Sequence, residues 1–114
     1  MEKEALLKLK NREFIYACLQ ILMNKNHKSD FDILVNSNEC KRRFDMNYAI
    51  LQKVCDFGSI DKSYFLDATG NRRYYPNTIT FQGVRYIVCN DWYYEGKSNN
   101  RDTRTDFLNW VLKD

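Results

Sequence analysis

The sequence predicts a single α+β domain, because the spacing of its apolar residues changes from a helical to a strand period near residue 60. Before this point, apolar residues recur every three or four positions. After it, short runs rich in Tyr, Val, Ile and Thr are separated by turns that contain Gly or Asn. The length of 114 residues suits one domain with a packed core. We expect a helical part, a β part, and a loop with a final helix, at residues 1–58, 59–92 and 93–114.

Residues 2–24 are predicted to form the first helix. Glu2 and Glu4 lie near its N-terminus and Lys25 follows its C-terminus, which is the charge order that a helix dipole favours. Residues 14–19 are apolar around nearly the whole circumference of this helix, and such a helix is usually buried on several sides. We therefore expect a core helix, with a partner-binding helix as the alternative.

The rest of the helical part contains three shorter predicted elements. A polar loop at residues 24–30 is followed by an apolar run at 31–36, which is predicted to form a short strand. A second helix is predicted at 37–44. A tight polar turn at 45–47 then leads into a third helix at 47–56, because apolar residues recur there at helical spacing.

The β part is predicted to be a small antiparallel meander. Residues 63–67 and 73–75 are expected to pair around a turn that contains Gly70. The stronger signal lies in residues 78–89, where two β-rich runs are separated by Gln82-Gly83 alone. A two-residue connection with Gly favours a tight hairpin.

The register of this second hairpin follows from its two-residue turn. It places Phe81 opposite Val84 and Ile79 opposite Tyr86. Alternate residues of a strand point to the same face of the sheet, so these four residues share one face with Val88. This apolar face is expected to pack on the helices.

The C-terminal part is predicted to be a loop followed by a helix of about ten residues. Residues 95–104 are polar and contain Gly and several Asn, which is typical of a loop. The helix after it has too many apolar residues to remain in water. We expect them to dock on the sheet, on the first helix, or on a second copy of the chain as a homodimer. They are Phe107, Leu108, Trp110, Val111 and Leu112.

The charge and hydropathy of the chain exclude two classes of protein. With 18 basic and 15 acidic residues, the net charge is +3, which is too small for a protein that coats nucleic acid by charge alone. The positive excess is greatest at residues 62–85, which hold four basic residues and one acidic residue. No apolar run is long enough to cross a membrane, and the N-terminus lacks the pattern of a secretory signal. We therefore expect a cytoplasmic protein with no membrane partner.

Few residues have the spacing needed for catalysis or metal binding. The cysteines are Cys18, Cys40, Cys55 and Cys89, and no two of them have CxxC spacing. Reduced thiols are therefore expected, rather than a zinc site or a disulfide framework. His27 is the single histidine, and no Ser or Cys stands beside it in a nucleophile turn. We expect no cofactor, no metal and no enzymatic activity.

Residues 37–58 resemble the helix-turn-helix of winged-helix DNA-binding proteins. In that motif an apolar residue closes the first helix, a polar turn follows, and apolar residues at helical spacing hold the second helix in place. Here Phe44 closes the first helix, and Leu51 and Val54 have the spacing that would hold the second. The hairpins at residues 63–89 would then form the wing.

The resemblance implies a small DNA-binding protein that acts in transcriptional control or in a mobile-element or phage system. The third helix would enter the major groove, and the wing tip would lie near the backbone or the minor groove. The residues implied in phosphate contacts are Lys41, Arg42 and Arg43; those implied in base contacts are Asn47, Tyr48, Gln52 and Lys53; those at the wing tip are Arg72 and Arg73.

A second function is equally open, which is that of a protein-interaction module such as an adaptor or an inhibitor of a larger host protein. Tyr and Trp are the residues favoured at the energetic centres of protein interfaces. They cluster at two places in this chain that are expected to be exposed. The residues are Tyr74, Tyr75, Trp92, Tyr93 and Tyr94.

Overall fold

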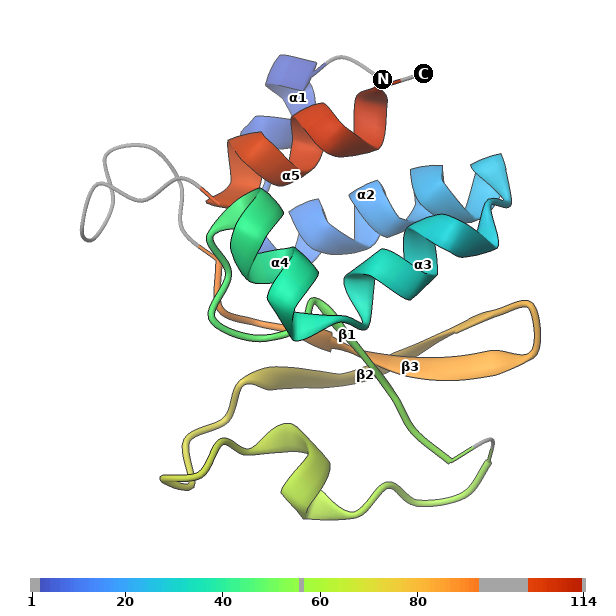
Figure 1. Ribbon diagram of the computed structural model, residues 1–114, viewed down its shortest axis with the longest axis vertical. Coiled ribbons are helices and arrows are strands. Elements are labelled where there is room, and N and C mark those ends of the chain that lie inside the picture. The colour runs from blue at the N-terminus through green and yellow to red at the C-terminus, as the bar shows by residue number, and fades with distance from the viewer. Residues whose placement is uncertain (1–2, 56, 93–102, 114) are drawn as a thin grey trace.

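The computed structural model describes residues 3–55, 57–92 and 103–113, and within them it confirms the α+β class. The helices lie over one face of a three-stranded antiparallel sheet, and residues 57–73 pass on the other side of it (Figure 1). The elements are α1 (Lys3–Leu7), α2 (Asn11–Lys25), α3 (Lys28–Leu34), α4 (Ser37–Phe44), β1 (Leu51–Lys53), η1 (Lys62–Phe65), β2 (Tyr74–Phe81), β3 (Val84–Cys89) and α5 (Thr103–Leu112).

The predicted first helix is interrupted, because α1 ends at Leu7 and α2 begins at Asn11. The carbonyl groups of Leu6, Leu7 and Leu9 accept hydrogen bonds from the Arg104 guanidinium, at 2.7 to 3.5 Å. A helix end leaves carbonyl groups without partners inside the helix, and Arg104 supplies donors for them. The break therefore depends on a residue far along the chain.

Among the described residues, no helix combines the length and the apolar character that a membrane span requires.

The strand predicted at residues 31–36 is wrong, because α3 covers most of that run. Phe31 and Leu34 are both fully buried, and their spacing of three places them on one face of a helix. Phe31 stacks on Phe81 with ring centroids 4.0 Å apart and also contacts Tyr86 at 5.7 Å. A short apolar run fits a strand or a buried helix equally well, and packing on the sheet selects the helix here.

The helix predicted at residues 37–44 is confirmed as α4. The side chain of Asn36 accepts a hydrogen bond from the main-chain N–H of Glu39 at 3.1 Å, so Asn36 is the N-cap. Asp45 ends the helix in the left-handed conformation, with φ at 58°. Asp adopts this conformation more readily than most residues, and it turns the chain sharply away from α4.

The third helix predicted at residues 47–56 is wrong, because this segment contains β1. After Asp45 the chain runs to the edge of β3, where Leu51 pairs with Val88. Met46, Ile50 and Leu51 are fully buried, so the apolar residues that suggested a helix do serve the core, from an extended chain. The helix that would enter a DNA groove is therefore not formed by residues 47–53.

The second hairpin is confirmed with its predicted register, in which Phe81 pairs with Val84 and Ile79 with Tyr86. Both turn residues have positive φ, 49° at Gln82 and 79° at Gly83, as the favoured tight hairpin turn requires. The meander is wrong in one respect. The strand order is β1-β3-β2, so β1 lies beside β3 and both β1 and β2 are edge strands.

The first predicted hairpin is reduced to a short turn. Residues 62–65 form the 3-10 helix η1, and a single bridge joins Leu66 to Arg72. The Asp67 carboxylate accepts hydrogen bonds from the main-chain N–H groups of Thr69 and Asn71, at 2.9 and 3.0 Å. The Asp67 carboxylate thus binds main-chain N–H groups of its own turn, and local hydrogen bonds of this kind favour a compact loop over a strand.

The final helix is confirmed as α5, and its apolar residues pack inside the same chain. Phe107 contacts Phe44, Trp92 and Trp110, with ring centroids 5.2 to 6.1 Å apart. Trp92 in turn contacts Phe14 of α2 at 6.2 Å. The residues that suggested a homodimer are thus buried except for Leu112, which is 37% exposed. Most of the predicted loop at 95–104 lies outside the described residues.

Candidate functional site

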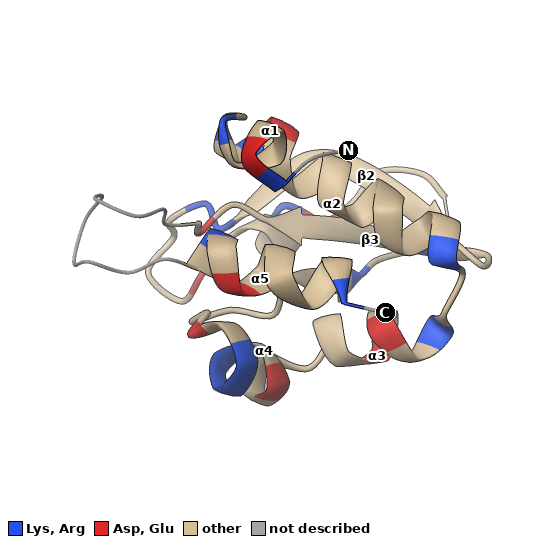
Figure 2. Cartoon of the chain, turned by 90° about the horizontal axis from the view of Figure 1, so that it is seen from above, with Lys and Arg blue, Asp and Glu red and all other residues tan. Residues whose placement is uncertain are grey.

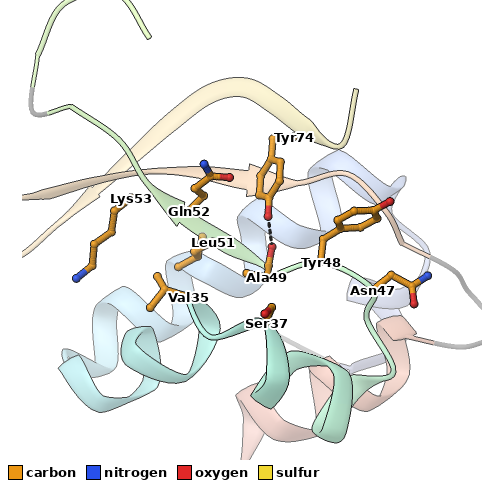
Figure 3. A pocket seen from close by; sticks show the side chains of 9 residues that line it. All are labelled: Val35, Ser37, Asn47, Tyr48, Ala49, Leu51, Gln52, Lys53 and Tyr74. Atoms are coloured by element: carbon orange, nitrogen blue, oxygen red, sulfur yellow. Dashed lines mark hydrogen bonds between the residues drawn. The ribbon is translucent and has the colours of Figure 1, made fainter. Parts of the chain in front are cut away.

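A cleft of about 580 Å³ opens beside β1, and we call it the β1 groove (Figure 3). One wall is the segment from residue 47 to 53, with Asn47 and Lys53 at opposite ends of it. The other wall is the junction between α3 and α4. The lining residues are Val35, Ser37, Asn47, Tyr48, Ala49, Leu51, Gln52, Lys53 and Tyr74.

Two hydrogen bonds hold the base of the groove in place. The Tyr74 hydroxyl donates to the Ala49 carbonyl at 2.7 Å, and the main-chain N–H of Ile50 donates to Cys40 Sγ at 3.4 Å. Burial raises the pKa of the Tyr74 phenol far above its usual range, so the hydroxyl stays protonated and remains a donor. Residues 49 and 50 are therefore fixed from both sides, by β2 and by α4.

The ladder between β1 and β3 determines which main-chain groups of β1 are used. The N–H of Cys89 donates to the Ile50 carbonyl at 2.8 Å, and the N–H of Val54 donates to the Arg85 carbonyl at 3.0 Å. In the antiparallel register, these residues stand directly opposite each other and form hydrogen-bonded pairs. Such pairs alternate along an antiparallel ladder with pairs that make no ladder bonds.

Leu51 and Lys53 occupy the positions of β1 that make no ladder hydrogen bonds with β3. Their N–H and C=O groups point away from β3, along the free edge of β1 that borders the groove. Among the residues that the structure describes, no hydrogen bond is formed by these main-chain groups. Leu51 is fully buried while Lys53 is exposed, so the unpaired row begins inside the protein and ends at its surface.

The groove is weakly electropositive. Lys53 is the one charged residue among its nine lining residues, and its side chain makes no hydrogen bond or ion pair with any described residue. Helix α4 begins at Ser37 on the opposite wall, and the N-terminus of a helix carries a partial positive charge. The remaining polar lining consists of neutral amide and hydroxyl groups, which both donate and accept hydrogen bonds.

Four of the nine residues predicted to bind nucleic acid line this groove, although no helix presents them. They are Asn47, Tyr48, Gln52 and Lys53. The other five lie elsewhere. Lys41, Arg42 and Arg43 are on the outer surface of α4, while Arg72 and Arg73 follow the turn at Asp67.

Basic and acidic residues both lie on α4 (Figure 2), and the basic residues are paired with carboxylates. Lys41 lies 2.8 Å from Asp45, and both Arg42 and Arg43 contact Glu39, at 2.7 and 2.9 Å. These arginines hold the pKa of Glu39 below its usual value through hydrogen bonds. The helix face is thus a mixed-charge surface rather than a uniformly basic one.

The two arginines of the predicted wing tip are also held by their neighbours. Arg73 lies 2.9 Å from Asp67 and 3.9 Å from Asp91, and its guanidinium covers the ring of Tyr48. Arg72 is exposed, and its guanidinium lies over the ring of Phe65 at 5.8 Å. Arg73 therefore has a structural role at the end of the β1 groove.

The exposure predicted for the aromatic cluster is wrong for the members that the structure shows as buried. Tyr74 is 7% exposed and Trp92 is 5% exposed, with its indole N–H donating to the Cys89 carbonyl. Tyr75 is half-buried against Tyr16. Tyr93 and Tyr94 lie outside the described residues. Aromatic rings are strongly apolar, and the rings of Tyr74 and Trp92 are buried in the core.

Sequence reasoning missed four residues of the groove, which are Val35, Ser37, Ala49 and Leu51, whereas Tyr74 is one of the residues it predicted for protein interaction. No local pattern marks the four, because the groove exists only where β1 reaches the edge of β3.

Comparisons with protein-family models, with curated proteins and with solved structures found no match to this chain.

Proposed function

We propose that the protein is a protein-interaction module that binds an extended peptide segment of a partner in the β1 groove. One observation carries the proposal, which is the length of the groove along residues 47–53 combined with a lining that is mostly neutral. Its volume falls in the range of about 300 to 1,000 Å³ that is common for binding sites. An extended chain matches a cleft that follows a strand better than a compact ligand does.

The lining supplies each kind of contact that a peptide uses. Val35 offers an apolar surface, and Ser37 and Gln52 offer hydrogen-bond donors and acceptors. Lys53 at one end can pair with an acidic side chain. The proposal keeps the interaction function of the sequence-based alternative. Of the aromatic residues named for that function, Tyr74 lines the groove, whereas Trp92 does not.

Nucleic-acid binding is the second candidate. It is favoured by the exposure of Lys41 and Arg42 on α4 and of Arg72 at the turn. Their carboxylate neighbours weaken it, because Asp45 and Glu39 would repel phosphates. A lining with one cation also gives few of the phosphate contacts on which such binding depends.

The experiment uses peptides selected against the full chain from a random-peptide display library, with binding measured by fluorescence anisotropy. Ser37→Trp places a large side chain on the groove wall, at an exposed first position of α4. Asn38→Trp is the matched control, because Asn38 is exposed next to Ser37 but does not line the groove. We expect Ser37→Trp to weaken peptide binding by about tenfold or more and Asn38→Trp to leave it nearly unchanged.

Two results would count against the peptide proposal. One is a library that yields no binder, and the other is a set of binders that respond equally to the two tryptophan variants. Random duplex and single-stranded DNA pools, titrated at low and raised salt, test the second candidate. Binding that falls steeply with salt and weakens in Arg42→Glu would favour nucleic acid instead.

A further inference from the structure

We propose that the partner segment binds as an added strand beside β1, through main-chain hydrogen bonds, with an acidic side chain placed against Lys53. This inference rests on the proposed function and specifies how the groove recognises its partner. The main-chain N–H and C=O groups of Leu51 and Lys53 point away from β3, and they have no hydrogen-bond partner among the described residues.

The unpaired groups at Leu51 are unusual because the residue is fully buried. Main-chain N–H and C=O groups that are removed from water are nearly always hydrogen-bonded. A peptide in the groove would reach the main-chain groups of Lys53 directly, because Lys53 is exposed, whereas those of Leu51 are covered in the free protein. It would supply an acceptor and a donor at Lys53 first.

The other edge of the sheet does not offer a similar row. Strand β2 contains Pro76, which has no N–H group. The Tyr16 hydroxyl of α2 donates to the Asn77 carbonyl at 2.7 Å, and Arg12 donates to the Asn77 side chain. Proline and a covering helix are the usual means of blocking an edge strand, so β2 is closed where β1 is open.

The chemistry of this row distinguishes a peptide from a nucleic-acid strand. It presents donors and acceptors in alternation, and a second peptide backbone has the same alternation. A sugar-phosphate backbone would bring a negatively charged acceptor at every step and no N–H group. Lys53 and the N-terminus of α4 add positive charge at the groove, which favours a peptide that carries Asp or Glu.

The decisive test compares Lys53→Pro with Lys53→Ala. Both variants remove the ammonium group, but only proline removes the N–H that points away from β3. Because this N–H makes no ladder bond, β1 can keep its pairing with β3. With peptides selected from the display library, we expect Lys53→Pro to bind about fivefold more weakly than Lys53→Ala. We also expect the selected peptides to be enriched in Asp or Glu.

Amide hydrogen exchange on the unaltered protein gives a second measurement that does not depend on a variant. In the free protein we expect the Lys53 amide to exchange much faster than the Val54 amide, which donates to Arg85. Added peptide should slow exchange at Lys53 and leave Val54 unchanged.

The outcomes separate this inference from the proposed function. If peptides bind and Ser37→Trp weakens them, but Lys53→Pro equals Lys53→Ala and the Lys53 amide stays unprotected, strand addition is wrong and peptide binding stands. If no peptide binds, both are wrong. If the Lys53 amide becomes protected with protein concentration alone and sedimentation shows a dimer, the added strand comes from a second copy and the proposed partner is overturned.

Discussion

The aromatic layer beneath α5 and the β1 groove lie on either side of α4, and they treat similar side chains in opposite ways. In the layer, Phe44, Phe107 and Trp110 fill the space between helices edge to face. In the groove, Tyr48 and Tyr74 form walls around space that stays open. The difference shows that aromatic residues fill the helical side of the molecule, whereas the polar, weakly charged edge at β1 keeps an open groove.

The largest expected effect comes from opening the aromatic layer. Phe107 is fully buried and touches three other rings, so Phe107→Ala removes a large side chain and leaves a cavity. We expect the free energy of unfolding to fall by about 3 to 5 kcal/mol, as measured by urea denaturation. Leu112→Ala is the control on the same helix, because Leu112 is 37% exposed. Equal losses in the two variants would show that α5 does not pack as described.

A second prediction concerns the turn that closes one end of the groove. Hydrogen bonds from Thr69, Arg73 and Asn71 hold the pKa of Asp67 far below its ordinary 3.8. A carboxyl group with a lowered pKa in the folded state stabilises the fold when it is ionised. This contribution is complete above about pH 5 and is lost progressively as the pH falls through 4 and below.

Thermal unfolding measured from pH 7 down to pH 3 checks this prediction. We expect Asp67→Asn to be less stable than the unaltered protein at pH 7, and the gap to narrow as the pH falls. Asp61→Asn is a useful comparison, because Asp61 also has a lowered pKa but, within the described part of the chain, accepts only from Ser63, so its gap should be smaller. A gap for Asp67→Asn that stays constant with pH would exclude ionisation as the cause.

The same contrast between regions explains which features the sequence could predict. The hairpin around Gln82-Gly83 was predictable with its register, because both strands and the turn are adjacent in the chain and the turn residues require positive φ. The extent of α4 at residues 37–44 was predictable for the same reason, whereas its N-cap at Asn36 is seen only in the structure. Residues 47–56 are predicted to form a helix, since Leu51 and Val54 have a spacing that suits one.

What made that segment a strand is an edge of β3 that forms far away in the sequence, and tertiary pairing of this kind overrides local propensity. The candidate site was predictable only in part for the same reason. Its polar members are predicted only as the outward face of a helix that does not form, whereas Val35 and Ala49 line the groove only after β1 has docked. The break between α1 and α2 likewise depends on Arg104 from the other end of the chain.

The smallest expected effect sharpens the comparison, because it separates stability from binding at the groove. The Gln52 side chain is half-buried and makes no hydrogen bond with any described residue, while its main chain pairs with Ile87. Gln52→Ala should therefore change the free energy of unfolding by no more than about 0.5 kcal/mol, since Ala keeps the main-chain pairing. Urea denaturation measures this, and the library-selected peptides measure binding in parallel. We expect peptide binding to weaken while the free energy of unfolding stays nearly the same. A fall in the free energy of unfolding of more than about 1 kcal/mol, with peptide binding unchanged, would contradict this. It would mean that the Gln52 side chain supports the sheet and has no part in binding at the β1 groove.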